Sequence, residues 1–304
     1  MMHQSLLHAI GNTPLVKLPI SNHGSIYAKL EYLNPGGSVK DRSALFMIEE
    51  AERSGKLKPG GTIIDASSGN QGIASAMIGA IKGYKVIVTV SEKISEEKLK
   101  AILAYGAQVI MCPSTKYIED PNNYHRRAVE LNKNTPNSFM PNQYFNPLNA
   151  QGHYTLLAPE VWKQTNGTVT HFFAAAGTCG TISGVGRYLK EKNPAIKILA
   201  VDSDKSFRST NGNPQPYKVE GMGIDWNNSP VLDESVIDDY LPVSDDNALG
   251  MLKTLASKHG ILAGPSSGAV AWAAQDYARH LKDGDVAVII FGDSGRAYLT
   301  KNFY

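Results

Sequence analysis

The chain has 304 residues, 30 of them basic and 28 acidic, and its formal net charge is +2. Hydrophobic residues make up 42% and charged residues 19%, a balance typical of a globular protein that buries a core. The small net charge excludes the strong basic bias of a nucleic-acid-binding protein. The length predicts about two domains or one large α/β unit.

Cysteine usage and apolar runs indicate the compartment. Cys112 and Cys179 lie far apart and outside any CxxC spacing, which argues against a disulfide framework and a zinc site. The start of the chain lacks the charged and apolar regions of a signal peptide. Apolar runs such as Val286–Phe291 are shorter than the roughly 20 residues that span a bilayer. We expect a cytoplasmic protein with no metal ion and no membrane or nucleic-acid partner.

Strand-like and helix-like segments alternate along the chain. In chain order we expect a strand at residues 63–64, a helix over 73–82, a strand over 86–90, a helix with Leu99, Ile102 and Leu103 on one face, and a strand over 109–112. The pattern resumes with strands at 171–176, 198–201 and 287–291, with helices between them. Such alternation is typical of parallel sheets covered by helices on both faces, so the predicted fold class is doubly wound α/β.

A polar stretch rich in proline and asparagine, residues 136–149, separates the two series. It divides the chain into a smaller α/β lobe over residues 42–146 and a larger lobe made of residues 1–41 plus 147–304. We expect a ligand between the lobes at the carboxyl ends of the strands, where open α/β sheets bind their ligands.

The first polar segment that bears glycines, residues 34–42, runs from a turn into a helix and reads Asn-Pro-Gly-Gly-Ser-Val-Lys-Asp-Arg. It places Lys40 in the first helical turn, where the positive end of the helix dipole disfavours an ammonium group. A partly buried lysine there would have the lowered pKa that Schiff-base chemistry requires. On these residues alone, an ordinary exposed lysine at a helix start remains the alternative.

Two further segments each follow a strand and precede a helix. Residues 67–72, Ser-Ser-Gly-Asn-Gln-Gly, bring hydroxyls, amides and backbone N–H groups to a helix start, an arrangement that suits a carboxylate. Plain N-capping by Ser68 or Asn70 is the alternative. Residues 177–181, Gly-Thr-Cys-Gly-Thr, favour a phosphate monoester over a simple turn because of their threonines. They match neither the dinucleotide fingerprint nor a Walker A sequence.

The fourth segment, residues 264–268, reads Gly-Pro-Ser-Ser-Gly and formally matches the nucleophile elbow of α/β hydrolases. A hydrolase would need an acid and a histidine after Ser266, and the candidates are Asp276 and His280. Both fall within the helix that the elbow itself would start, which is poor triad geometry. The hydrolase interpretation therefore fails on context.

Together and in this order, the four segments resemble the fold-type II pyridoxal phosphate enzymes, specifically the cysteine synthase and cystathionine β-synthase family. The resemblance covers essentially the whole chain, from residues 10–15 (Ile-Gly-Asn-Thr-Pro-Leu) to 293–298 (Asp-Ser-Gly-Arg-Ala-Tyr). It implies two α/β lobes like those of the tryptophan synthase β chain, pyridoxal 5′-phosphate as cofactor, amino-acid substrates and a homodimer.

The same resemblance implies a role for each matching residue. Lys40 would hold the cofactor covalently and serve as the catalytic base. Asn70 would bond the cofactor's 3′ oxygen, and Ser266 would face its pyridine nitrogen. The phosphate would be bound by Gly177, Thr178, Cys179, Gly180 and Thr181. The substrate would be bound by Ser67, Ser68, Gly69, Gln71, Gln143 and Gly221.

Within the family, residues 142–147, 219–223, 231–233 and 296–301 are closer to cystathionine β-synthase than to cysteine synthase. We therefore expect a thiol, homocysteine, to replace the β-substituent of serine or an O-activated serine. Cysteine synthase, with O-acetylserine and sulfide, is the alternative, and a diaminopropionate-type synthase with an amine nucleophile is a third. A deaminating dehydratase and a binding protein without activity are further alternatives. Retention of Lys40, Asn70 and Ser266 disfavours the last.

Three residues depart from the family pattern. Gln71 stands where threonine is usual, Cys179 replaces a glycine of the phosphate loop, and Ile224 occupies a position where many cystathionine β-synthases have tyrosine. The first and third changes bear on the substrate and thiol sites, and we interpret the second as a tolerated side chain. Because the family's regulatory domains and heme-binding extension are not in this sequence, we expect no regulation by adenosyl ligands or heme.

Overall fold

The computed structural model describes residues 3–115, 120–224 and 229–304. The chain divides into two compact units, a smaller one made of residues 1–10 and 34–146 and a larger one made of 11–33 and 147–304. The smaller unit thus takes in residues 1–10 and 34–41, which we had predicted in the larger lobe. The helix that begins at Lys40 packs within the smaller unit, so the turn that leads into this helix belongs there too.

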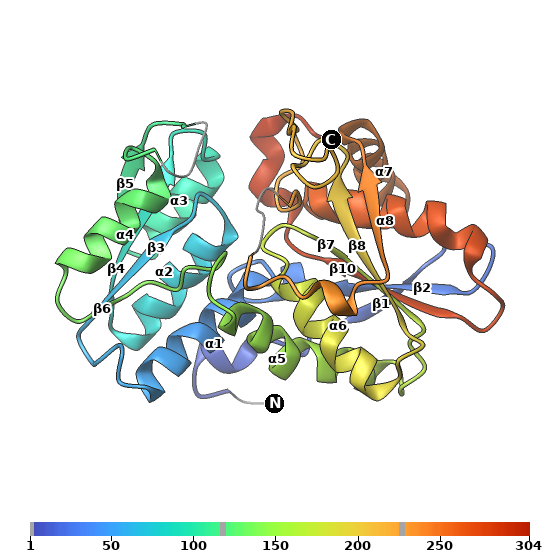
Figure 1. Ribbon diagram of the computed structural model, residues 1–304, viewed down its shortest axis with the longest axis horizontal. Coiled ribbons are helices and arrows are strands. Elements are labelled where there is room, and N and C mark those ends of the chain that lie inside the picture. Colours follow the sequence, from blue (N-terminus) through green and yellow to red (C-terminus); the bar gives the residue numbers. More distant parts are fainter. Residues whose placement is uncertain (1–2, 116–119, 225–228) are drawn as a thin grey trace. The chain divides into compact units, whose positions relative to one another are not determined.

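The smaller unit contains a parallel sheet of four strands in the order β5-β4-β3-β6. The strands of this sheet are labelled in Figure 1. Its strands are β3 (Thr62–Ala66), β4 (Lys85–Ser91), β5 (Gln108–Cys112) and β6 (Ser138–Phe139). Its helices are the 3-10 helix η1 (Leu6–Ala9), α1 (Lys40–Arg53), α2 (Asn70–Lys82), α3 (Glu96–Ala104) and α4 (Tyr124–Asn134). The predicted alternation of strands and parallel pairing are confirmed.

Successive residues of β3 serve opposite faces of this sheet, as a strand dictates. Ile63 packs in a hydrophobic cluster with residues of α1, α2 and α3, whereas Ile64 packs in a second cluster with Ala128 of α4. The sheet is therefore covered on both faces. One detail of the prediction is wrong: Ile102 is buried, but Leu103 is 50% exposed. Adjacent residues of a helix differ by about 100° around its axis, so Leu103 turns away from the core.

The larger unit has a sheet of six strands in the order β1-β2-β10-β7-β8-β9. Its strands are β1 (Leu15–Leu18), β2 (Ser25–Leu30), β7 (His171–Ala175), β8 (Lys197–Ser203), β9 (Asp239–Val243) and β10 (Val286–Phe291). All neighbours pair in parallel except β1, which pairs antiparallel with β2. The prediction of parallel strands did not anticipate this pair. A short connection of six residues joins β1 to β2, too short for the crossover that a parallel pair needs.

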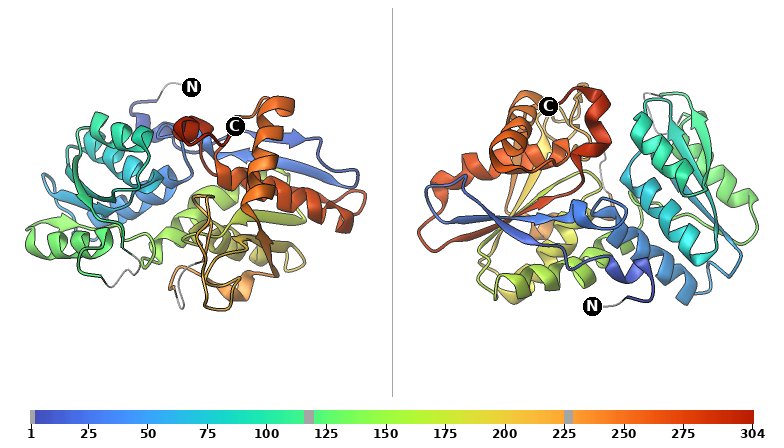
Figure 2. Two further views of the ribbon diagram at one scale, coloured as in Figure 1. Left: turned by 90° about the horizontal axis from the view of Figure 1, so that it is seen from above. Right: turned by 180° about the vertical axis from the view of Figure 1, so that it is seen from behind.

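Helices cover the larger sheet as well (Figures 1 and 2). They are α5 (Leu148–Gln164), α6 (Gly180–Lys192), α7 (Asp245–His259) and α8 (Pro265–Tyr277), with the 3-10 helices η2 (Glu31–Leu33), η3 (Glu234–Val236), η4 (Ala278–His280) and η5 (Gly295–Lys301). Phe173 and Val201 belong to the core cluster that includes residues of α7 and α8, whereas Ile198 lies against Gly186 of α6. No helix in the described part of the chain is long and apolar enough to cross a bilayer.

The contact between α5 and α6 depends on glycine. A Cβ atom added to Gly184 would lie 2.1 Å from the backbone oxygen of Ala150, and backbone cannot turn aside as a flexible side chain can. Gly250 of α7 offers a matched contrast, because an added Cβ atom there meets no atom within 4 Å.

Gly184→Ala should lower the free energy of unfolding by roughly 1–3 kcal/mol, because overpacking forces the two helices apart. Gly250→Ala should raise it by about 0.5–1 kcal/mol, because alanine loses less conformational freedom in a helix. Urea unfolding of both variants measures the difference. Equal changes in the free energy of unfolding of the two variants would contradict the close approach of α5 and α6.

Candidate active site

Lys40 is the first residue of α1, so its predicted place in the first helical turn is confirmed. Hydrogen bonds hold the turn before it. The Lys40 backbone N–H donates to Ser38 Oγ at 3.2 Å, and the Gly36 N–H donates to Asp41 Oδ2 at 2.6 Å. Asp41 is fully buried, whereas Lys40 is half-buried. The buried carboxylate thus fixes the turn and leaves the lysine partly accessible to a ligand.

The segment of residues 67–72 leaves the carboxyl end of β3 and enters α2, as predicted. Ser67 Oγ accepts from the Gly69 N–H at 3.2 Å, and Ser68 Oγ accepts from the Ser91 N–H at 2.6 Å. The first hydrogen bond within α2 runs from the Ile73 N–H to the Gly69 oxygen. The N–H groups of the preceding first turn therefore have no acceptor in the helix and suit an anion.

The side chain of Gln71 does not take part in that helix start. It is fully buried, and its amide nitrogen donates to Ser75 Oγ, one turn further along α2, at 3.4 Å. Gln71 therefore has its backbone at the predicted carboxylate position and its side chain in the interior of the smaller unit. This inward direction could not be predicted from the sequence, because a glutamine at a helix start is usually exposed.

Gln143 lies in the same unit and is 5% exposed. It follows β6, which pairs in parallel with β3. Segments that follow neighbouring parallel strands leave the sheet at the same edge. Gln143 and the segment of residues 67–72 therefore share one edge of the smaller sheet, which is the arrangement expected of substrate-binding residues.

Residues 177–181 connect β7 to α6, again as predicted. Cys179 caps α6 in the left-handed conformation, with φ 66°, which favours glycine. The first helical hydrogen bond runs from the Ser183 N–H to the Cys179 oxygen, and the Gly180 N–H donates to Thr178 Oγ1 at 3.5 Å. The N–H groups of the two residues between Gly180 and Ser183 have no acceptor within the helix and suit an anion. The Thr178 and Thr181 hydroxyls flank this start and are nearly buried. The donors at this turn are those that a phosphate monoester requires.

Two buried side chains of α5 orient those hydroxyls. Asn149 Nδ2 donates to Thr178 Oγ1 at 3.1 Å, and His153 Nε2 lies 3.3 Å from Thr181 Oγ1. Asn149 and His153 are four residues apart and therefore share one helix face. Sequence reasoning missed both residues. Their four-residue spacing predicts that the two side chains share a helix face, but no sequence pattern predicts that this face contacts residues 177–181.

Three predicted site residues of the larger unit meet at one place. A Cβ atom added to Gly177 would lie 2.8 Å from the Gly221 oxygen, and one added to Gly221 would lie 3.4 Å from Ser266 Oγ. Gly221 has φ 87°, a conformation that glycine adopts without strain. The backbone of Gly221 therefore lies between the phosphate loop and the Ser266 hydroxyl, and there is no room for a larger side chain at Gly177.

The start of α8 holds Ser266 in the first helical turn, with Gly264 as the N-cap residue. The Gly264 N–H donates to the backbone oxygen of Asp293 at 2.8 Å, and the Asp293 carboxylate accepts from the Tyr298 hydroxyl at 2.5 Å. Burial, and then the charge of Asp293, hold the pKa of Tyr298 well above its ordinary value. Tyr298 therefore stays protonated and donates, which keeps this support of the α8 start intact.

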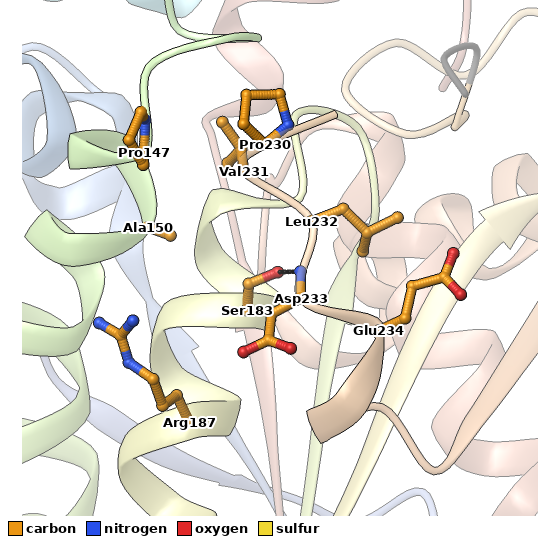
Figure 3. Close-up of a pocket in the computed structure, with 9 residues that line it drawn as sticks. All are labelled: Pro147, Ala150, Ser183, Arg187, Pro230, Val231, Leu232, Asp233 and Glu234. Carbon is orange, nitrogen blue, oxygen red and sulfur yellow. Dashed lines mark hydrogen bonds between the residues drawn. The ribbon is translucent and has the colours of Figure 1, made fainter. Parts of the chain in front are cut away.

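A separate pocket of about 440 Å³ opens in the larger unit beside α6. Ala150 and Arg187 lie on its helical side and residues 230–234 on the facing segment, where the Asp233 N–H donates to Ser183 Oγ at 3.0 Å (Figure 3). None of the predicted site residues lines this pocket. In the described part of the chain, no cluster of three or more histidine, cysteine or acidic side chains is arranged to hold a metal ion.

The residues present fit pyridoxal phosphate. The phosphate would take N–H groups and threonine hydroxyls at the start of α6, which Asn149 and His153 orient. The neutral hydroxyl of Ser266, 8% exposed, would meet the ring nitrogen. Asn70, the first residue of α2, would bond the 3′ oxygen, and Lys40 would supply the amine for covalent attachment.

Comparisons with known proteins agree with this fit. Cystathionine beta-synthase of Apis mellifera is 45% identical over 97% of this chain, which spans 60% of that relative. Cysteine synthase of Staphylococcus aureus is 40% identical over 99% of this chain and 96% of its own length. The O-acetylserine-dependent cystathionine beta-synthase of Helicobacter pylori, 39% identical, superposes with a TM-score of 0.91 over 100% of this chain and 99% of that one.

A structure of O-ureido-L-serine synthase, 34% identical, superposes with a TM-score of 0.93 over 100% of this chain and 95% of its own. These neighbours confirm the predicted two-lobed α/β fold class. The family model of the pyridoxal-phosphate dependent enzymes matches residues 6–293, nearly the whole chain. The chain belongs to the family of pyridoxal-phosphate-dependent enzymes.

Proposed function

We propose that this enzyme replaces the β-substituent of serine or an O-activated serine with a thiol, and that the thiol is homocysteine. The observation that carries the proposal is the position of Ser266. Its neutral hydroxyl lies beside Gly221 at the start of α8, where the ring nitrogen of the cofactor would be held. A neutral partner does not force protonation of the ring nitrogen, and this favours prompt loss of the β-substituent over a long-lived carbanion.

The bound cofactor supplies an electron sink for the α-carbon of the amino acid. The amine of Lys40 acts as the general base and removes the α-proton from the substrate. Its place in the first turn of α1 keeps it half-buried beside the clamped turn of Gly36 and Asp41. The substrate carboxylate would lie at the start of α2, where the N–H groups of the first turn and the Ser67–Ser68 hydroxyls provide donors.

The choice of homocysteine rests on local similarity. Residues 219–223, 231–233 and 296–301 are closer to cystathionine β-synthase, and the Apis mellifera enzyme of that name is 45% identical. Sulfide is the second candidate, because the cysteine synthase of Staphylococcus aureus matches this chain over 96% of its own length.

We further propose that the enzyme is a homodimer and that it lies in the cytoplasm. Sedimentation of the purified protein would test the first proposal, and fractionation of the producing cell would test the second.

Lys40→Ala should lower the turnover number by roughly 10²–10⁴-fold, the contribution of a positioned general base, and should abolish the visible absorbance band of the bound cofactor. Lys58→Ala, an exposed lysine of the same unit, is the control and should change neither quantity. Steady-state rates and absorbance spectra provide the measurements. A Lys40→Ala protein with full turnover would contradict the assignment.

A product assay tests the choice of substrates. Serine, O-acetylserine and O-phosphoserine are each incubated with homocysteine, sulfide or ammonia, and the products are identified by mass spectrometry. We expect cystathionine as the fastest product. Cysteine or diaminopropionate as the fastest product would replace homocysteine with one of the alternatives. Release of a keto acid from every donor, without any replacement product, would contradict β-replacement altogether.

A further inference from the structure

Asp65 is a buried carboxylate that the proposed mechanism does not use. It is the fourth residue of β3, is 1% exposed and lies two residues before Ser67. Its Oδ2 accepts from Ser75 Oγ at 2.6 Å, and Ser75 Oγ in turn accepts from Gln71 Nε2 at 3.4 Å. Asp65, Gln71 and Ser75, named here the Asp65 cluster, thus link the end of β3 to the first two turns of α2.

The Asp65 cluster has more acceptors than donors. Asp65 Oδ1 and Gln71 Oε1 are both buried, and neither has a hydrogen-bond partner among the described residues. Desolvation by burial raises the pKa of Asp65 to about 6, although the hydrogen bond from Ser75 opposes this rise.

The other groups that face Asp65 are neutral. Thr89 of β4 donates from its hydroxyl to the Tyr124 backbone oxygen at 2.7 Å and lies 3.5 Å from the Asp65 backbone oxygen. Tyr124 of α4 has its pKa raised, first by burial and then by the charge of Asp65, so its hydroxyl stays protonated. Within the described residues, the hydrogen bonds and charge interactions recorded for Asp65 include no cation.

We propose that Asp65 is a positioning residue that acts through Ser75 and Gln71 to hold the start of α2 in the conformation that binds the carboxylate of the donor amino acid. The inference rests on the proposed function, because it gives Asp65 a part in the same site. It also accounts for the direction of Gln71, whose side chain is drawn into the interior by the cluster.

The direction of the pH effect follows from the hydrogen bonds. The hydroxyl of Ser75 donates to Asp65, and a donor bond to an ionised carboxylate is stronger than one to a neutral acid. The start of α2 is therefore held more firmly when Asp65 is ionised. Affinity for the donor amino acid should fall as the pH falls through about 6.

The decisive variant is Asp65→Asn, which keeps the shape of the side chain and removes its titration. The measurement is the dissociation constant of L-serine from pH 5 to pH 8, taken from the change in the cofactor's absorbance band of the holoenzyme. The wild-type affinity should fall by about 5-fold or more towards pH 5, a typical allosteric coupling. Asp65→Asn should bind as weakly at pH 8 as the wild type at pH 5.

Unfolding of the apoprotein in urea gives a readout that does not depend on activity. Because the pKa of Asp65 is raised in the folded chain, the wild type should gain stability relative to Asp65→Asn as the pH falls from 7 to 5. The fall in serine affinity between pH 8 and pH 5 is called the pH step. Ser75→Ala should reduce this step, and it replaces Asp65→Asn as the test variant if Asp65→Asn fails to fold. Ser138→Ala removes a hydroxyl that bonds to the Asn132 and Thr135 oxygens instead, and should leave the step unchanged.

The outcomes separate the two proposals. A wild-type protein whose absorbance band responds to serine, with the same pH step retained in Asp65→Asn and Ser75→Ala, overturns the role of Asp65 and leaves the proposed function standing. A wild-type protein without a cofactor band, or without any response to a donor, overturns the proposed function and the role of Asp65 with it.

Discussion

Helix starts at the carboxyl ends of parallel strands are the constraint on which the candidate site depends. A helix cannot satisfy the N–H groups of its own first turn, and a parallel sheet collects such starts along one edge. In this chain, α2 follows β3 and α6 follows β7, and the segments before them carry the proposed ligands for the substrate carboxylate and the cofactor phosphate. The fold therefore provides helix starts that suit anions, whatever side chains the turns carry.

Close backbone packing then restricts which residues can stand at these helix starts. Gly177 lies against the Gly221 oxygen, and Gly180 lies against the buried amide of Asn149, which also orients Thr178. Buried polar groups impose a second restriction in the smaller unit, where Asp41 clamps the turn before Lys40 and Asp65 binds the second turn of α2. The carboxylates hold the loops, and the loops present the residues proposed for chemistry.

Much of this could be predicted from the sequence, because strand–turn–helix order and helix starts are local properties. The placement of Lys40 at a helix start and of residues 177–181 before α6 follows from such local patterns. The antiparallel β1 and the partners Asn149 and His153 could not be predicted, since they depend on contacts between segments distant in sequence. The inward direction of the Gln71 side chain depends on Asp65 and Ser75, and the pattern of apolar residues in the sequence does not predict it.

The proposed chemistry requires the cofactor to be attached covalently to Lys40, which chemical mapping of the attachment site can test. The purified holoenzyme is reduced with borohydride, digested, and its peptides are weighed by mass spectrometry. We expect the peptide that contains Lys40, and no other, to gain the mass of a reduced pyridoxyl phosphate group. The same mass on a different lysine, with the Lys40 peptide unmodified, would contradict it.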